Sequence, residues 1–380
     1  MRPESTPSPD SGETTMARLN RSEILDPEAI ETVHVYNRVV RRCFLLGDDK
    51  VTGKNYDHRK DWIEQLLAVQ AKYFAIDLLG FAILTNHFHQ ILRSRPDAAA
   101  TWNATEVARH WLMICPKRKG RDGQALEPKQ NEINSICNDL PKLKQIRRRL
   151  SDISWWMRLL CQKVAQRANR EDETPGKFWE SRFQSVKILD ETGLLACAAY
   201  VDLNPIRADL VELLEETDYT SAQRRISALL LEQQQAAAAS SSEESPSGTE
   251  SPSTTERPDR FLSPLTIDEL QDEIGVHLNT TGDRCSDKGF LNMSVESYIE
   301  LLDWTARSIA AGKRGVTPAA APAVLERLGL QPTAWCELVE NFGELFHSVA
   351  GRPTVVDAAR SRHRQGRFHA TPRLRQLFES

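Results

Sequence analysis

Two histidines separated by one residue are the first candidates for chemistry in this sequence. They are His87 and His89, in the tripeptide His87-Phe88-His89. Side chains two residues apart on a β-strand project to the same side, so both imidazoles could hold one metal ion while Phe88 points into the core. Taken alone, the pair favours packing or chance over a metal site, because this pattern is common in unrelated chains.

A tyrosine and an asparagine four residues apart are the second candidate. In the segment Tyr200-Val201-Asp202-Leu203-Asn204-Pro205, Tyr200 and Asn204 share one face of a helix. The amide oxygen of Asn204 can bind a metal ion, with the Tyr200 phenol one helical turn away. Taken alone, this pattern favours a buried tyrosine on an amphipathic helix that stops at Pro205.

Together, the two candidates supply what a tyrosine needs to cleave a phosphodiester. A divalent metal polarises the phosphoryl oxygen and stabilises the developing charge. The tyrosine oxygen attacks phosphorus and becomes linked to one DNA end, and the retained bond energy allows strands to be rejoined. Two neutral nitrogens and an amide oxygen leave room in an octahedral Mg²⁺ or Mn²⁺ shell for water and the scissile phosphate. The predicted metal ligands are His87, His89 and Asn204, and the predicted nucleophile is Tyr200.

The surrounding elements must place these residues side by side. Apolar periodicity predicts strands at 32–44, 75–84, 87–92 and 184–189, and helices at 56–74, 100–114, 151–169 and 191–204. Asp190 is placed to cap the last helix and Pro205 to stop it. With one helix set aside, the order is βαββαβ, which indicates an α+β fold with a ferredoxin-like antiparallel sheet and extra helices.

Composition divides the 380-residue chain into four parts. Residues 1–25 are poor in apolar side chains and are predicted to be a disordered tail. Residues 26–230 form the main domain, and the basic segment 116–140 within it is expected to be a loop. Residues 231–260 turn to Ala, Ser, Glu and Pro, which is typical of a flexible linker. Residues 261–380 recover helical patterning, for example at 298–309 and 334–346, and predict a small helical accessory domain.

The bulk numbers set limits on location and partners. The net charge is −4, yet basic residues cluster at 117–121 and 147–149, as in a phosphate-binding footprint or a solvated surface. The seven cysteines are scattered without a CxxC pair, which fits a reducing compartment and offers no zinc or redox motif. No apolar run suits a signal peptide or a membrane span. We therefore expect a cytoplasmic protein with no membrane partner.

Four segments in the right order carry a resemblance to a known family. They are the opening strand 34–38, the motif Asn86-His87-Phe88-His89, the aromatic segment 178–183 and the tyrosine helix 200–208. In these segments the chain resembles the REP-associated tyrosine transposases, a branch of the single-tyrosine HUH transposases. The resemblance spans about residues 32–213.

The resemblance implies a role for each matching residue. It implies a metal held by His87, His89 and Asn204, with Tyr200 as the nucleophile that forms a covalent 5′-phosphotyrosine. The implied substrate is single-stranded DNA, often a hairpin-forming repeat. Relatives act as dimers or as monomers, so the expected state is a monomer or a homodimer.

Other side chains of the same segments are weaker candidates. Arg182, Lys187 and Arg207 could contact phosphates, although an ordinary surface charge is the commoner role for each. The aromatic side chains of 178–183 could stack on exposed bases, and for at least two of them core packing is favoured. His34 is either a third imidazole near the metal or a packed, hydrogen-bonded histidine.

Two other functions compete with DNA cleavage. A domesticated module would bind structured repeats without cutting, but a binder has no need of two histidines, a tyrosine and an asparagine together. A ferredoxin-like metal protein unrelated to nucleic acid would leave the clustered Lys and Arg residues unexplained. A structure with Tyr200 far from His87 and His89 would exclude both nucleic-acid readings.

Overall fold

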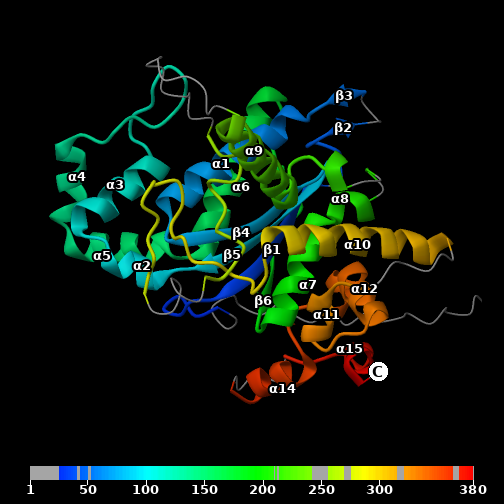
Figure 1. Ribbon diagram of the computed structural model, residues 1–380. Helices are drawn as coiled ribbons and strands as arrows, with labels where there is room; N and C mark the ends of the chain where they lie inside the picture. The colour runs from blue at the N-terminus through cyan, green and yellow to red at the C-terminus, as the bar shows by residue number, and fades with distance from the viewer. Residues whose placement is uncertain are drawn as a thin grey trace, which may run out of the picture.

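The protein has an α+β fold, shown in Figure 1. The computed structural model describes residues 25–40, 43–49, 53–208, 210–211, 214–241, 256–268, 275–314, 321–362 and 368–379. The predicted tail at 1–25 therefore lies, except for Leu25, outside the described residues.

A five-stranded sheet in the order β4-β5-β1-β6-β7 forms the centre of the fold. All neighbours are antiparallel except β6 and β7, which are parallel. A separate two-stranded ribbon pairs β2 with β3. The strands are β1 (Thr32–Arg38), β2 (Asp48–Asp49), β3 (Lys54–Asn55), β4 (Ile76–Ile83), β5 (His87–Ser94), β6 (Gln184–Ile188) and β7 (Val349–Ala350).

Helices cover both faces of this sheet. In the first half of the chain they are α1 (His58–Tyr73), α2 (Pro96–Thr101), α3 (Ala104–Ile114), α4 (Gln130–Cys137), α5 (Leu140–Leu150), α6 (Ile153–Glu171), α7 (Glu191–Asp202) and α8 (Asn204–Arg207). They continue with the 3₁₀ turn Leu214–Glu216, α9 (Ser221–Ser241), α10 (Val295–Arg314), α11 (Ala323–Arg327), α12 (Pro332–Glu340), α13 (Phe342–Leu345), α14 (Pro353–Arg362) and α15 (Pro372–Glu379).

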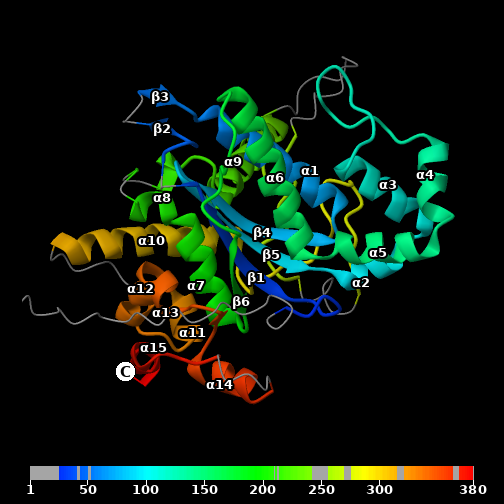
Figure 2. The ribbon, with the colours of Figure 1, turned by 180° about the vertical axis from the view of Figure 1, so that it is seen from behind.

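Strand alternation divides the core into two layers. Val33 and Val35 of β1 and Phe88 of β5 face α1 and α6, in a cluster that extends to α3 and α5. Helices α1 and α6 cover this face of the sheet, which is seen from behind in Figure 2. The alternate residues of the same strands, such as Ile91 of β5, face α7. Each strand therefore keeps one side for packing against α1 and α6 and presents the other to α7.

The C-terminal helices share the core of the α7 face. Trp335 and Phe342 are buried in the same cluster as residues of β5, β6 and α7. Strand β7 extends the sheet beside β6, and it passes so close to α7 that a Cβ on Gly193 would lie 2.9 Å from Ala350. Residues beyond 290 thus complete one face of the sheet. The domain boundary at 231–260 stays a prediction.

Several predicted helices and strands are shorter than expected or are divided in two. The helix expected at 100–114 is two helices, because Asn103 caps α3 in a capping box with Glu106. The loop expected at 116–140 contains α4. The Ala-rich start of the expected linker is helical to Ser241, and residues 242–255 lie outside the described part of the chain. Alanine has the highest helix propensity, so an Ala-rich segment can continue a helix. The linker-like composition of this segment did not indicate that continuation.

No helix in the described part of the chain is both long and apolar enough to cross a membrane.

A buried carboxylate ties α7 to later helices. Asp202 accepts hydrogen bonds from Ser221 Oγ (2.6 Å), the Ala222 amide (2.9 Å) and Tyr298 Oη (2.7 Å). Burial raises the pKa of Asp202, and these hydrogen bonds act against that rise. The carboxylate therefore fixes the C-terminal end of α7 against α9 and α10.

We predict that Asp202→Ala lowers the free energy of unfolding by about 2–4 kcal/mol, because three buried donors lose their acceptor. Asp202→Asn keeps an acceptor oxygen, and its loss should be smaller. Urea denaturation followed by circular dichroism measures both. Equal losses for the two variants would show that the hydrogen bonds are not the cause.

Candidate active site

Two paired strands place five side chains of the site on the α7 face of the sheet. Antiparallel register sets Tyr36 of β1 opposite His89 of β5, and Arg38 opposite His87. His34, two residues before Tyr36, lies on the same face, and Phe88 lies in the core on the other face. The predicted same-side projection of His87 and His89 is confirmed, with ring centroids 5.0 Å apart.

Tyr200 and Asn204 contact these histidines from the α7 side of the sheet. The Tyr200 ring meets the His89 ring edge to face, at 5.4 Å between centroids and 89° between planes. The side-chain amide of Asn204 lies 3.2 Å from His89 Nε2. The structure therefore brings together all four residues proposed from the sequence, although α7 ends at Asp202 and Asn204 begins the short helix α8.

His34 is held inside this group. Its Nε2 lies 2.9 Å from His89 Nδ1, and the two rings stack at 5.1 Å. When the Asn204 amide donates to His89 Nε2, the proton of His89 is on Nδ1 and is donated to His34. His34 is thus a packed, hydrogen-bonded histidine that orients His89.

Burial keeps the imidazoles neutral. It lowers the pKa of His34 to about 3 and that of His87 to about 4. For His87, the charges of Arg38 and Arg207 lower the pKa further, and a hydrogen bond to Asn204 acts against them. The pKa of His89 is lowered well below its usual value by burial and by its neighbours. Neutral rings have a free lone pair at ordinary pH.

These donors fit a divalent metal in their chemistry. His87 Nδ1 lies 2.6 Å from Asn86 Oδ1, and His89 Nδ1 is engaged by His34, so each ring has one nitrogen held by a neighbour. Metal-binding histidines are commonly oriented in this way. Across the described ranges, no group of three or more His, Cys, Asp or Glu side chains is placed to hold an ion. Beside the two histidines, the cavity presents the side-chain amide of Asn204, whose oxygen is a possible metal donor.

A cavity of about 240 Å³ opens over this group. Its other walls come from Arg38, Arg207 and the C-terminal residues Phe342, Gly343 and Phe346. Phe342 stacks on the Tyr200 ring with centroids 5.1 Å apart and planes at 28°. Sequence reasoning missed this C-terminal wall, because nothing in the pattern of 334–346 links it to a segment more than 130 residues earlier.

The three weaker phosphate candidates have different environments. Arg207 lies over the Tyr200 ring at 4.5 Å and donates to the Glu340 carbonyl, so it belongs to the cavity. Lys187 forms an ion pair with Glu31 at 2.5 Å. Arg182 is exposed and does not line the cavity.

The aromatic segment ahead of β6 packs into the protein. Phe178 and Phe183 are buried, as predicted for at least two of its rings. Trp179 packs against Phe88 at 5.3 Å and donates its indole N–H to the Cys161 carbonyl.

A basic groove lies on the opposite face of the sheet. It has a volume of about 370 Å³ and is lined by Trp62, Gln65, Leu66, Val69, Lys119, Asp122, Gly123, Gln124, Lys163, Gln166, Arg167 and Arg170. Its four cations form no ion pair with a carboxylate of the described residues. Arg167 stacks on Trp62 at 3.9 Å, and burial lowers the pKa of Lys163. The helical spacing of 163, 167 and 170 could have indicated this groove from the sequence.

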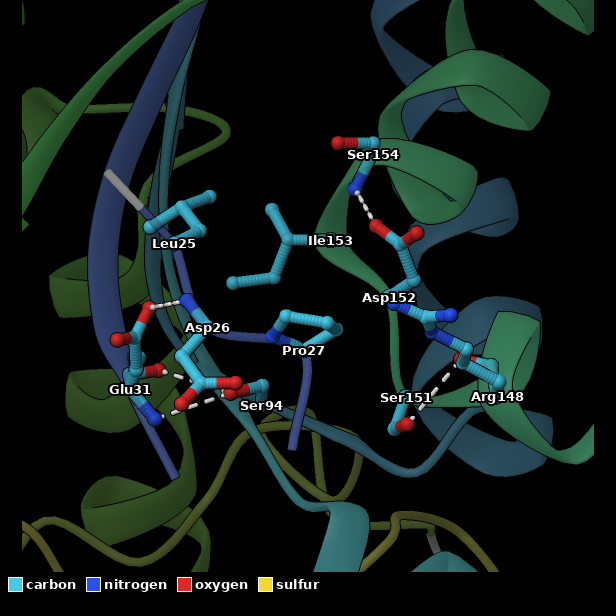
Figure 3. Close-up of a pocket in the computed structure, with 10 residues that line it drawn as sticks. All are labelled: Leu25, Asp26, Pro27, Glu31, Ser94, Arg148, Ser151, Asp152, Ile153 and Ser154. Carbon is cyan, nitrogen blue, oxygen red and sulfur yellow. Dashed lines mark hydrogen bonds between the residues drawn. The ribbon is translucent and has the colours of Figure 1, made fainter. Parts of the chain in front are cut away.

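Another cavity has no catalytic character. It measures about 190 Å³ and lies between the start of β1 and the start of α6, as shown in Figure 3. Asp152 caps α6 there through the Ser154 amide, and Ser94 Oγ accepts from the Glu31 amide. Because these polar groups are already engaged, we assign the cavity no chemistry.

Comparison with known proteins gives one likeness to report. The chain is similar to a solved structure described as a REP-associated tyrosine transposase bound to a REP hairpin, with 12% identity and a TM-score of 0.30. The similar region covers 52% of this chain and 79% of the other. No family profile and no curated protein matches the sequence. Because the superposition is loose, the proposal below rests on the site itself.

The neutral histidines predict how stability depends on pH. Between pH 6.5 and about 4 the unfolded chain binds protons that folded His34 and His87 do not bind. The free energy of unfolding should therefore fall as the pH falls from 6.5, by up to about 1.4 kcal/mol per pH unit for each histidine. Urea denaturation with chelator at pH 7 and pH 5 measures this fall. His34→Gln should make it shallower, and an unchanged fall would contradict the assignment.

Proposed function

We propose that the protein is a metal-dependent transposase that cleaves and rejoins single-stranded or hairpin DNA through Tyr200. The observation that carries the proposal is the joining of Tyr200, His89 and Asn204 in one cavity, by ring contact and by hydrogen bond. Two tyrosines, three neutral imidazoles, an amide and two guanidinium groups line this cavity. That set suits a phosphodiester substrate better than a neutral one.

Cleavage would proceed by exchange of one ester for another. The Tyr200 oxygen bonds to phosphorus and loses its proton to water, and the bond from phosphorus to the 3′ oxygen breaks. The departing 3′ oxygen takes up a proton and becomes a hydroxyl. The 5′ phosphate stays on Tyr200 as a phosphotyrosine, so attack by another 3′ hydroxyl reverses the step and joins strands.

We propose His87, His89 and Asn204 as the metal ligands. A bound Mg²⁺ or Mn²⁺ would supply Lewis-acid stabilisation of the charge on the phosphoryl group. The residues of the chain prepare the site for it. His34 fixes the orientation of His89, and Asn86 fixes that of His87. Arg38 and Arg207 add positive charge at the rim of the cavity.

A ferredoxin-like core is proposed for the sheet that positions these groups. Four strands in the order β4-β5-β1-β6, all antiparallel, follow the βαββαβ connection, with α1 and α6 on one face. The tyrosine helix α7 follows β6 and packs on the opposite face. In this arrangement the nucleophile lies directly over the two central strands.

The basic groove between α1 and α6 is proposed to bind the DNA backbone. Four cations without carboxylate partners, together with exposed Gln side chains, suit phosphate oxygens more than any sequence of bases. The groove lies on the face away from Tyr200, so one DNA molecule that contacts both must extend around the sheet. The DNA there would be a stem or flank distinct from the strand that is cut.

A covalent-adduct assay tests the nucleophile. Purified protein is mixed with labelled single-stranded hairpins from the flanks of its gene, with Mg²⁺ or Mn²⁺, and resolved on a denaturing gel. We predict a protein-linked DNA band that is lost in Tyr200→Phe and on chelation. Tyr36→Phe is the matched control, because Tyr36 lines the same cavity, and it should keep the band.

Two other results would change the proposal. Loss of the band in Tyr36→Phe but not in Tyr200→Phe would assign the nucleophile to Tyr36. Binding of the hairpins without any band, and without dependence on metal, would favour the domesticated binding protein.

The groove predicts a change in the salt dependence of DNA binding. Arg167→Ala and Arg170→Ala together should lower the slope of log affinity against log salt by about 1 to 2, because each lost phosphate contact contributes about 0.7–0.9. Fluorescence anisotropy with labelled hairpins measures the slope. Arg158→Ala is the control on the same helix, since Arg158 is exposed and outside the groove. Equal slopes in all variants would remove the groove from the DNA path.

A further inference from the structure

We infer that Phe342 is a positioning residue for Tyr200, so that the C-terminal segment 340–346 completes the site of the nucleophile. This inference rests on the proposed role of Tyr200. Phe342 lies outside the sequence segments that indicate the function. Its effect on the position of the Tyr200 ring can be measured separately from DNA cleavage.

The contacts of the Tyr200 ring carry the inference. Phe342 stacks on it nearly in parallel, at 5.1 Å and 28°. The rings of His89 and His34 meet it edge to face, at 5.4 Å and 5.8 Å. The Arg207 guanidinium lies 4.5 Å from its centre. The histidines of the strands thus meet the ring at a steep angle, and Phe342 supplies its stacked aromatic contact.

Phe342 is itself held firmly. It is fully buried, and its ring packs against Phe346 at 4.9 Å and against His34 at 5.8 Å. Arg207, one turn beyond Asn204, donates to the Glu340 carbonyl just before α13. A few residues later the chain enters the sheet as β7. A stack against such a fixed partner restricts the rotation of the tyrosine side chain.

Gly343 leaves open space beside the phenol oxygen. A Cβ at this position would lie 3.6 Å from Tyr200 Oη, and apart from its chain neighbours and its own helix backbone no other heavy atom would lie within 4 Å. The stacked neighbour therefore fixes the ring, while the next residue keeps the approach to its oxygen clear. A phosphodiester must come within about 3–3.5 Å of that oxygen before attack.

The expected consequence falls on the rate of cleavage, not on DNA affinity. A misplacement of about 1 Å at a reacting group can lower the rate by about 100-fold. Phe342→Leu keeps an apolar, buried side chain but removes the ring that stacks. We expect it to lower the single-turnover rate of adduct formation by about 10- to 100-fold, with the Kd for hairpin DNA changed by less than about 2-fold.

Phe290→Leu is the matched control. Phe290 is buried in the same apolar cluster but does not line the cavity. Loss of its ring perturbs the packing of that cluster and leaves the contacts of Phe342 with Tyr200 and Phe346 in place. Phe342→Tyr is the conservative variant, because it keeps an aromatic ring at the position.

The position of the Tyr200 ring is read without any DNA. The protein has six tyrosines, so ¹³C-labelled tyrosine gives few ring signals, and the signal absent from Tyr200→Phe is that of Tyr200. Ring current from Phe342 should shift this signal. We expect Phe342→Leu to move and broaden it, and Phe290→Leu and Phe342→Tyr to leave it sharp.

The outcomes separate this inference from the proposed function. A changed Tyr200 signal and a slower rate in Phe342→Leu alone, with recovery in Phe342→Tyr, support the positioning role. The same changes in Phe290→Leu, or an unchanged signal in Phe342→Leu, overturn it. If the wild-type protein forms no covalent adduct, the proposed function fails, and the Tyr200 signal still decides whether Phe342 positions the ring.

Discussion

The antiparallel register between β1 and β5 is the constraint on which the site depends. It sets Tyr36 opposite His89, and strand alternation then assigns His34, His87 and His89 to one face and Val33, Val35 and Phe88 to the other. A slip of one residue would send every imidazole into the packed layer under α1 and α6. The apolar residues that pack in that layer therefore also determine the face of the sheet on which the imidazoles lie.

Much of the site was open to prediction because its signals are local. His87 and His89 follow a period of two, and Tyr200 and Asn204 follow one turn of a helix, so each pair could be read from a few neighbours. The order of strands and helices along the chain followed from patterning in the same way. The end of the tyrosine helix did not, because α7 ends at Asp202 and Pro205, which was expected to stop it, lies in the first turn of α8. Asn103 divided an expected helix because a capping box outweighed the continuity of the apolar pattern.

What the sequence did not reveal depends on contacts between distant segments. Phe342 reads as one apolar residue of an amphipathic stretch, and only the folded chain shows that it meets Tyr200. The pairing of His34 with His89 likewise needs the register of two strands, because the two histidines are 55 residues apart in the sequence. The ion pair of Lys187 with Glu31 likewise joins two segments far apart in the sequence, and the charge of Lys187 alone could not indicate this partner. In each case, the partner is specified by topology and not by spacing.

The late position of β7 and Phe342 in the chain has a consequence for synthesis. The histidines and Tyr200 leave the ribosome well before residue 342, and contacts of such long sequence separation form slowly. A nascent chain therefore has β1, β5 and α7 before it has the wall over the nucleophile. The site of the proposed DNA chemistry becomes complete only after the segment 340–346 has been synthesised, so fragments that end before this segment lack the wall.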